Sequence, residues 1–157
     1  AANAGFEYVD MEIDGNGVVH VGYYDAYAGD VRYVQLPSYD STSSTDSLVD
    51  SYLIVGDKLS LSVHDMTGSG DYRPFLSYKG IGNTARAAWL EAGTPADGVD
   101  SQERYNGNWE VQSLPSPVED ADSNRFDVDI RSSDKMPVVG YTNSGLEYQR
   151  LLPDLGS

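Results

Sequence analysis

Apolar and polar residues alternate along most of this chain in short runs of six to nine residues. A period of two is typical of β-strands that bury one face, whereas helices repeat every three to four residues. Polar residues, glycine and proline separate the runs, as turns require. The pattern therefore predicts an all-β chain with strands at 6–14, 18–25, 31–36, 50–55, 59–65, 72–78, 108–114, 126–131, 137–142 and 146–152.

Two segments depart from the alternation. Residues 83–93, NTARAAWLEAG, combine good helix formers with Gly93 as a stop signal. We expect a short helix over about residues 84–92 there, within an insertion at 81–105. The polar stretch SYDSTSSTDS at 38–47 is expected to be a flexible connector.

The strands recur as a repeated unit within a single domain over residues 1–157. Each unit has a turn opened by aspartate, an alternating strand, a polar–glycine turn and a shorter strand. In this alignment Tyr24, His64 and Tyr141 occupy the same position. The units open at Asp14, Asp57 and Asp134 and predict blade-like repeats at about 5–36, 48–80 and 106–152.

Repeats of about 40–50 residues with three or four antiparallel strands are typical of β-propeller blades. The run D-x-x-G-x-x-H-V-x-Y-Y-D, followed by G-D-V-R-Y-V, resembles blades of bacterial extracellular six-bladed propellers of the sialidase-like or BNR-like class. The strands in 106–115, 126–134 and 137–142 follow one another as in that class. The strict Asp-box, Ser-x-Asp-x-Gly-x-x-Trp, does not occur. The resemblance implies a partial β-propeller of three blades, located outside the cell or on its surface.

Three blades leave open strand edges, which must be covered. We expect two copies or a partner chain to complete the ring, so a homo-oligomer or a bound partner is predicted. The alternative is a β-sandwich, in which the strands cover one another.

Charge and cysteine content argue against several classes of binding partner and site. The formal net charge is −15, from 25 acidic and 10 basic residues, which argues against partners such as nucleic acid and anionic membranes. No apolar run approaches the length of a membrane span. The chain has no cysteine, so disulfides and thiolate metal sites are excluded. The small residues of AANAGFEY suggest the start left by signal-peptide cleavage.

A calcium site is the one cofactor hypothesis that the sequence offers. Asp10, Glu12, Asp14 and Asn16 stand at alternate positions before a glycine-rich turn, which is typical of calcium loops. The acidic residue that closes such a loop is missing, because Val21 stands at its position. A hairpin turn explains the same spacing without a metal.

Catalytic patterns are scarce. The two histidines, His20 and His64, lie in different repeats, and no G-x-S-x-G motif accompanies the serines. A carboxylate pair of the glycosidase type stays open, because two such residues can meet in the fold. We therefore expect no catalytic residues of the chain's own.

Aromatic residues remain as candidates for recognition. Exposed rings bind sugars and protein partners alike, whereas alternate tyrosines such as Tyr23 and Tyr33 are expected to pack between blades. We predict a non-catalytic extracellular module that binds a glycan or a protein. The alternatives are a structural subunit of a filament or surface layer, and a glycosidase-like enzyme with a site formed across subunits. The candidate ligand-binding residues are Tyr24, His64, Tyr141, Trp89 and Trp109.

Overall fold

A computed structural model describes residues 6–52, 55–80, 84–90, 109–117, 126–131, 136–143 and 145–150. Within these residues the chain forms β-strands and no helix, so the prediction of an all-β chain is confirmed. Among the described residues there is no helix that is long and apolar enough to cross a membrane. The strands are β1 (Phe6–Ile13), β2 (Val19–Asp25), β3 (Asp30–Leu36), β4 (Thr45–Asp50), β5 (Asp57–Asp65), β6 (Tyr72–Lys79), β7 (Thr84–Leu90), β8 (Trp109–Pro117), β9 (Phe126–Arg131), β10 (Met136–Asn143) and β11 (Gly145–Arg150).

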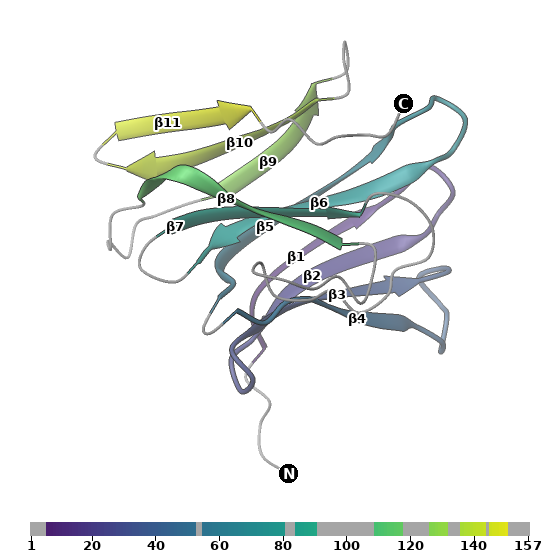
Figure 1. Cartoon of the computed structure of the whole chain (residues 1–157). Helices are drawn as coiled ribbons and strands as arrows, with labels where there is room; N and C mark the ends of the chain where they lie inside the picture. Colours follow the sequence, from purple (N-terminus) through teal and green to yellow (C-terminus); the bar gives the residue numbers. More distant parts are fainter. Residues whose placement is uncertain are drawn as a thin grey trace.

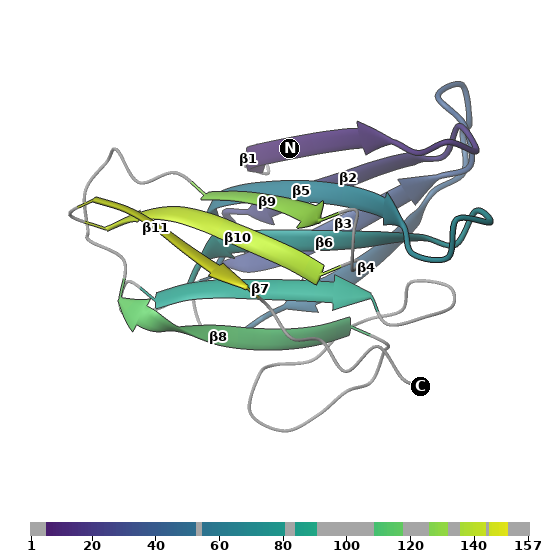
Figure 2. The ribbon, with the colours of Figure 1, turned by 90° about the horizontal axis from the view of Figure 1, so that it is seen from above.

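The strands form three antiparallel sheets in which consecutive strands are neighbours (Figure 1). The first sheet has the order β1-β2-β3-β4, the second β5-β6-β7-β8 and the third β9-β10-β11. Viewed from above, the first strands β1, β5 and β9 lie together along one side of the molecule, whereas β4 and β8 lie along the other (Figure 2). Each sheet is thus a meander that starts at the same side of the stack.

The sheets pack face to face, and the second sheet lies between the other two. Its strands β6 and β7 are buried on both faces, at every position of residues 74–78 and 85–90. One core fills the space between the first and second sheets, with Val31, Tyr33, Val49, Leu61, Val63, Leu76, Tyr78, Ala88, Leu90 and Trp109 among its members. A second core, between the second and third sheets, contains Phe75, Ala85, Ala87, Trp89, Leu114, Phe126, Val128 and Val139.

The expected helix at about 84–92 is wrong, because residues 84–90 form β7. Its alanines are fully buried between two layers of side chains. Small side chains let the outer sheets approach both faces of this strand, and this packing overrides the helix propensity of alanine. Residues 84–90 are therefore a strand of the second sheet and no insertion. The rest of 81–105 lies outside the described residues.

The boundary between the first two repeats also differs from the prediction. The strand expected at 50–55 is instead β4, Thr45–Asp50, which begins inside the expected connector 38–47. It pairs with β3, and Leu48 lies opposite Arg32. The position of β4 is set by its pairing with the edge of β3. The polar composition of the segment gave no sign of a strand there.

The sheet order corrects the predicted alignment of the repeats. Tyr24 and Tyr141 lie on the second strands of their sheets, β2 and β10, whereas His64 lies on β5, the first strand of its sheet. The three residues therefore do not share one structural position. The misalignment arose because every strand shows the same alternation and most hairpin turns use the same residues.

Candidate functional site

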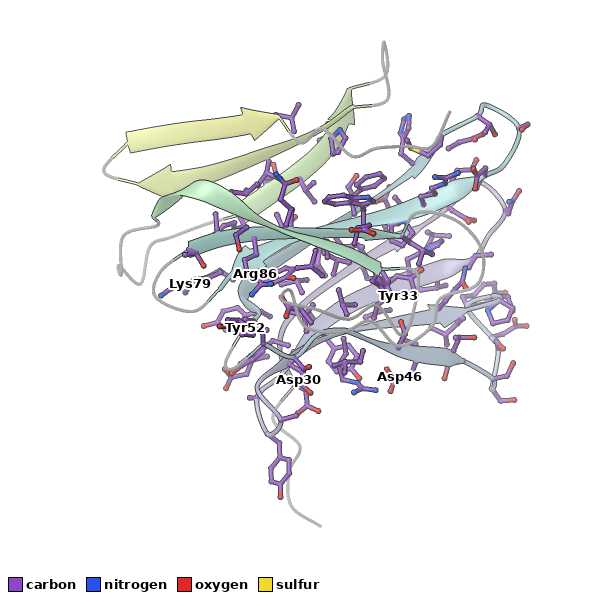
Figure 3. The ribbon with its side chains drawn as sticks, viewed as in Figure 1. Asp30, Tyr33, Asp46, Tyr52, Lys79 and Arg86 are labelled. Atoms are coloured by element: carbon purple, nitrogen blue, oxygen red, sulfur yellow. The ribbon has the colours of Figure 1, made fainter. Side chains whose placement is uncertain are left out.

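The interface between the first two sheets contains a buried ion pair. The Nε atom of Arg86 lies 3.1 Å from Oδ2 of Asp50, and neither side chain is more than 2% exposed. The hydroxyl group of Tyr78 donates a hydrogen bond of 2.7 Å to the same oxygen. Burial and the Asp50 carboxylate raise the pKa of Tyr78 well above its usual value, so it stays protonated. The ring of Tyr52 lies 5.7 Å from the Arg86 guanidinium carbon (Figure 3).

Carboxylates of β1 also cover the edge of β5. Oδ2 of Asp10 accepts a hydrogen bond of 2.8 Å from the backbone N–H of Leu61, and Oε2 of Glu12 accepts one of 2.6 Å from Val63. Burial raises the pKa of Glu12, the Val63 bond opposes this, and Asp10 and Asp129 raise it further. These bonds satisfy edge amides that would otherwise face a neighbouring sheet unpaired.

Gly22 makes the close approach of the sheets possible. A Cβ atom at Gly22 would lie 2.7 Å from Cδ2 of Leu76 and 3.1 Å from Cδ2 of Leu59. Gly22 stands opposite Asp10 on the neighbouring strand. The second sheet therefore contacts the first through the carboxylates of β1 and packs closely against the glycine of β2.

The opposite face of the first sheet is apolar and exposed in the described part of the structure. Val9, Met11 and Ile13 of β1 are 58%, 60% and 55% exposed. A groove of about 340 Å³ on this face is lined by Val9, Val21, Tyr23 and Val34. We call this surface the outer apolar face; it consists of Val9, Met11, Ile13, Val21, Tyr23, Arg32 and Val34.

Strand β1 therefore points Val9, Met11 and Ile13 away from the protein and the carboxylates of Asp10 and Glu12 toward β5. A strand at the surface of a monomer usually has the reverse orientation. The carboxylates are retained inside by the amides of β5, so the register of β1 forces Val9, Met11 and Ile13 outward.

Arg32 crosses this face and pairs with Asp46 of β4 at 3.1 Å. The side chains are 25% and 45% exposed, so water screens the pair. The Asp46 carboxylate and the hydroxyl of Tyr23 raise the pKa of Arg32, while burial opposes them as the largest single effect. Figure 3 shows Asp46 on the outer side of the first sheet and Tyr33 on the side that faces the second sheet.

The outer face of the third sheet has a different character. Asp127 and Asp129 are exposed, while Val128 between them is buried against the second sheet. With Val138 and Gly140 they line a groove of about 420 Å³. A Cβ atom at Gly140 would have nothing within 4 Å. We call Asp127, Asp129, Val138 and Gly140 the outer acidic face.

His20 lies in the interior, in a series of hydrogen bonds and ring contacts. His20 pairs through Nε2 with Asp14 at 3.2 Å and through Nδ1 with the hydroxyl of Tyr33. Burial lowers the pKa of His20, and Asp14 and Glu12 offset this in part. The ring of Tyr33 contacts Trp109, whose Nε1 donates to Ser47. All these groups except Asp14 and Glu12 are at most 1% exposed, so they join the sheets and present no surface to a substrate.

The structure separates the predicted ligand-binding residues. Trp109 is fully buried and Trp89 is 5% exposed, so these rings belong to the two cores and form no surface platform. Tyr24 lies beside Gly56, just before β5, whereas His64 lies near the far end of β5. Tyr141 lies on β10, and its side chain is outside the described part of the structure.

The residues proposed for calcium have hydrogen-bond partners within the protein. Asp10 and Glu12 bind the edge of β5, as described above. One carboxylate oxygen of Asp14 accepts hydrogen bonds from the amides of Asn16 and Val18 and so closes the hairpin turn. Asn16 donates to the carbonyl of Gly70. Among the described residues, no three His, Asp or Glu side chains gather into a possible metal site.

No protein-family model, curated protein or solved structure matches this chain.

Proposed function

We propose that this chain is a non-catalytic, extracellular protein-binding module, built as three blades of a partial β-propeller. It binds by docking another β-sheet on its outer apolar face. The observation that carries the proposal is the inverted orientation of β1, in which Val9, Met11 and Ile13 are more than half exposed while the half-buried carboxylates of Asp10 and Glu12 bind β5. Fully burying an apolar side chain of this size contributes about 1.5–3 kcal/mol, so covering this face favours association.

The arrangement of the sheets supports the propeller architecture. Each of the first two sheets is a four-stranded meander, the sheets stack face to face, and their first strands lie together. Propeller blades have these same features. The extracellular location rests on the resemblance of the repeats alone.

A protein partner agrees better with the structure than a glycan does. Two of the five aromatic candidates for sugar binding lie in the cores. The large exposed surface is aliphatic, and aliphatic side chains suit the packing of another protein surface.

Photo-cross-linking tests this proposal. Met11 is replaced by a photoreactive amino acid, and the same group is placed at Tyr39, which is 86% exposed in the loop that joins β3 and β4. The variants are irradiated alone and in the extracellular fluid of the source, and the adducts are identified by mass spectrometry. We expect one defined protein adduct at Met11 and none at Tyr39. No adduct at Met11, or equal adducts at both positions, contradicts the proposal.

A further inference from the structure

We infer that the outer acidic face of a second copy of this chain occupies the outer apolar face, so that copies associate head to tail. This inference rests on the proposed function and specifies its partner. Both outer faces repeat, at corresponding strand positions, the residue pattern of the two faces that already meet inside the molecule.

The outer apolar face of the first sheet corresponds to one face of the second sheet, namely the face that packs against the first sheet. Met11, Val21 and Val34 lie opposite one another across three neighbouring strands of the first sheet. The corresponding row of the second sheet, which is buried, is Leu61, Leu76 and Ala88.

The polar residues of the two faces correspond as well. Tyr23 lies opposite Arg32 in the first sheet, and Tyr78 lies opposite Arg86 in the second. The inner tyrosine and arginine meet the buried Asp50 of the preceding sheet. The outer apolar face thus contains the same tyrosine and arginine, and there Arg32 pairs with Asp46 of its own sheet.

Bulges place the first strands in the same register. The pairing of β1 shifts between Glu7 and Asp10, and that of β5 shifts between Asp57 and Ser60. The bulges contain the two described non-glycine residues with positive φ, Tyr8 at 49° and Lys58 at 59°. The correspondence of Met11 with Leu61, and of Ile13 with Val63, follows from these positions.

The outer acidic face of the third sheet corresponds to the inner face of the first sheet, which packs against the second sheet. Asp10 lies opposite Gly22, and Asp127 lies opposite Gly140. The sequences agree in pattern, VDMEI at 9–13 with FDVDI at 126–130, and VGY at 21–23 with VGY at 139–141.

These correspondences define the contact between copies. Asp127 and Asp129 of one copy accept hydrogen bonds from the backbone amides of Met11 and Ile13 of the next, as Asp10 and Glu12 do for Leu61 and Val63. Asp127 thereby replaces Oδ1 of Asp10, which accepts from the Met11 amide within the single chain. The open space at Gly140 receives Val9 and Val21, as Gly22 receives Leu59 and Leu76. The two faces differ, so the contact is head to tail and produces either a closed ring or an open filament.

Cysteine pairing tests the contact, because the chain has no cysteine of its own. Val9→Cys and Gly140→Cys are made in separate chains, mixed and oxidised mildly. Tyr39→Cys serves as an exposed control. We expect the Val9–Gly140 mixed disulfide to form at least about ten-fold faster than either homodimer or any pair with Tyr39→Cys, because docking raises the effective concentration of the matched thiols.

A second test uses the carboxylates in the cysteine-free parent. Asp127→Asn with Asp129→Asn weakens the acceptors of the contact, and Asp40→Asn in a surface loop is the matched control. We expect sedimentation velocity to show that the dissociation constant of self-association rises roughly ten-fold or more for the double variant alone. A monomeric parent at micromolar concentration, or an unchanged dissociation constant, overturns the inference.

The outcomes separate this inference from the proposed function. Random pairing of the cysteine variants, or preferred Val9–Val9 dimers, refutes head-to-tail association. If Met11 then cross-links to a different protein, the protein-binding function stands and its partner is that protein. If Met11 forms no adduct, both proposals fail.

Discussion

At the scale of single residues, the same pair of side chains occurs in two environments. Arg86 is almost completely buried with Asp50, whereas Arg32, at the corresponding position of the first sheet, is partly exposed with Asp46. A buried charge that loses its partner is costly, while an exposed pair is screened by water. The two pairs therefore allow the stability contribution of a buried ion pair to be compared with that of an exposed one in the same protein.

We expect Asp50→Ala to lower the free energy of unfolding by about 3–5 kcal/mol, because it leaves Arg86 buried and unpaired and removes the acceptor of Tyr78. Asp46→Ala, the matched control, should cost about 0–1 kcal/mol. Urea unfolding followed by tryptophan fluorescence measures both. Equal losses in the two variants would contradict the buried ion pair.

His20 makes stability depend on pH. Burial lowers its pKa below 6.5 in the folded protein, so the unfolded chain binds a proton more readily. The contribution to stability is complete above about pH 6.5 and is lost as the pH falls through the lower folded pKa, by up to about 1.4 kcal/mol per pH unit.

Urea unfolding between about pH 5.5 and 7.5 measures this loss. We expect His20→Gln to remove it and His64→Gln, at a half-buried position on β5, to retain it. NMR titration of the His20 imidazole gives an independent measurement. A pKa at or above 6.5 for His20 would show that the sign is reversed.

At the scale of elements, β1 covers the edge of β5 with side chains and not with its own backbone. The first two sheets therefore stay separate, although their first strands lie together. This contact also fixes which face of β1 points outward. The register of one strand thus determines both an internal interface and the outer apolar face.

We expect Glu12→Ala to cost about 1–3 kcal/mol, because the amide of Val63 loses its acceptor at a partly buried site. Glu7→Ala, an exposed position on the same strand, is the control and should change stability by less than about 0.5 kcal/mol. Hydrogen exchange adds a local measurement, in which the Val63 amide exchanges faster in Glu12→Ala alone. Unchanged protection of Val63 would refute the bond.

At the scale of the whole molecule, the stack has two different ends. One end carries the outer apolar face and the other the outer acidic face, and each repeats one side of the internal interface. Gly22 lies at an occupied interface, and Gly140 lies at the corresponding open one.

We expect Gly22→Ala to destabilise the chain by about 1–3 kcal/mol, because its Cβ meets Leu76 in a packed core. Gly140→Ala meets no atom within 4 Å, so the stability of the single chain should stay within about 0.5 kcal/mol. Thermal unfolding at low protein concentration measures both. A large loss for Gly140→Ala would show that its outer side is already covered within the chain.

The sequence by itself determined the strand content, because a two-residue period follows directly from the geometry of a strand that buries one face. Nine of the ten expected strands, all but the one at 50–55, are present at nearly the expected positions. The glycine-rich turns were equally local, as at Gly17 and Gly29, whose φ angles are positive. The packing of Tyr33 between sheets followed from the same alternation, whereas Tyr23, expected there as well, lies on the outer apolar face.

The tertiary structure decided what depends on neighbours distant in sequence. β7 is a strand because two sheets enclose its alanines, and β4 is one because β3 pairs with it. The sites of Trp89 and Trp109 depended on layers that no local pattern reveals. The alternation of β1 contained Val9, Met11 and Ile13 from the start, but only the bonds from Asp10 and Glu12 to β5 determined which side faces water. A period of two defines two faces of a strand, and only the packing of the whole chain decides which of them is inside.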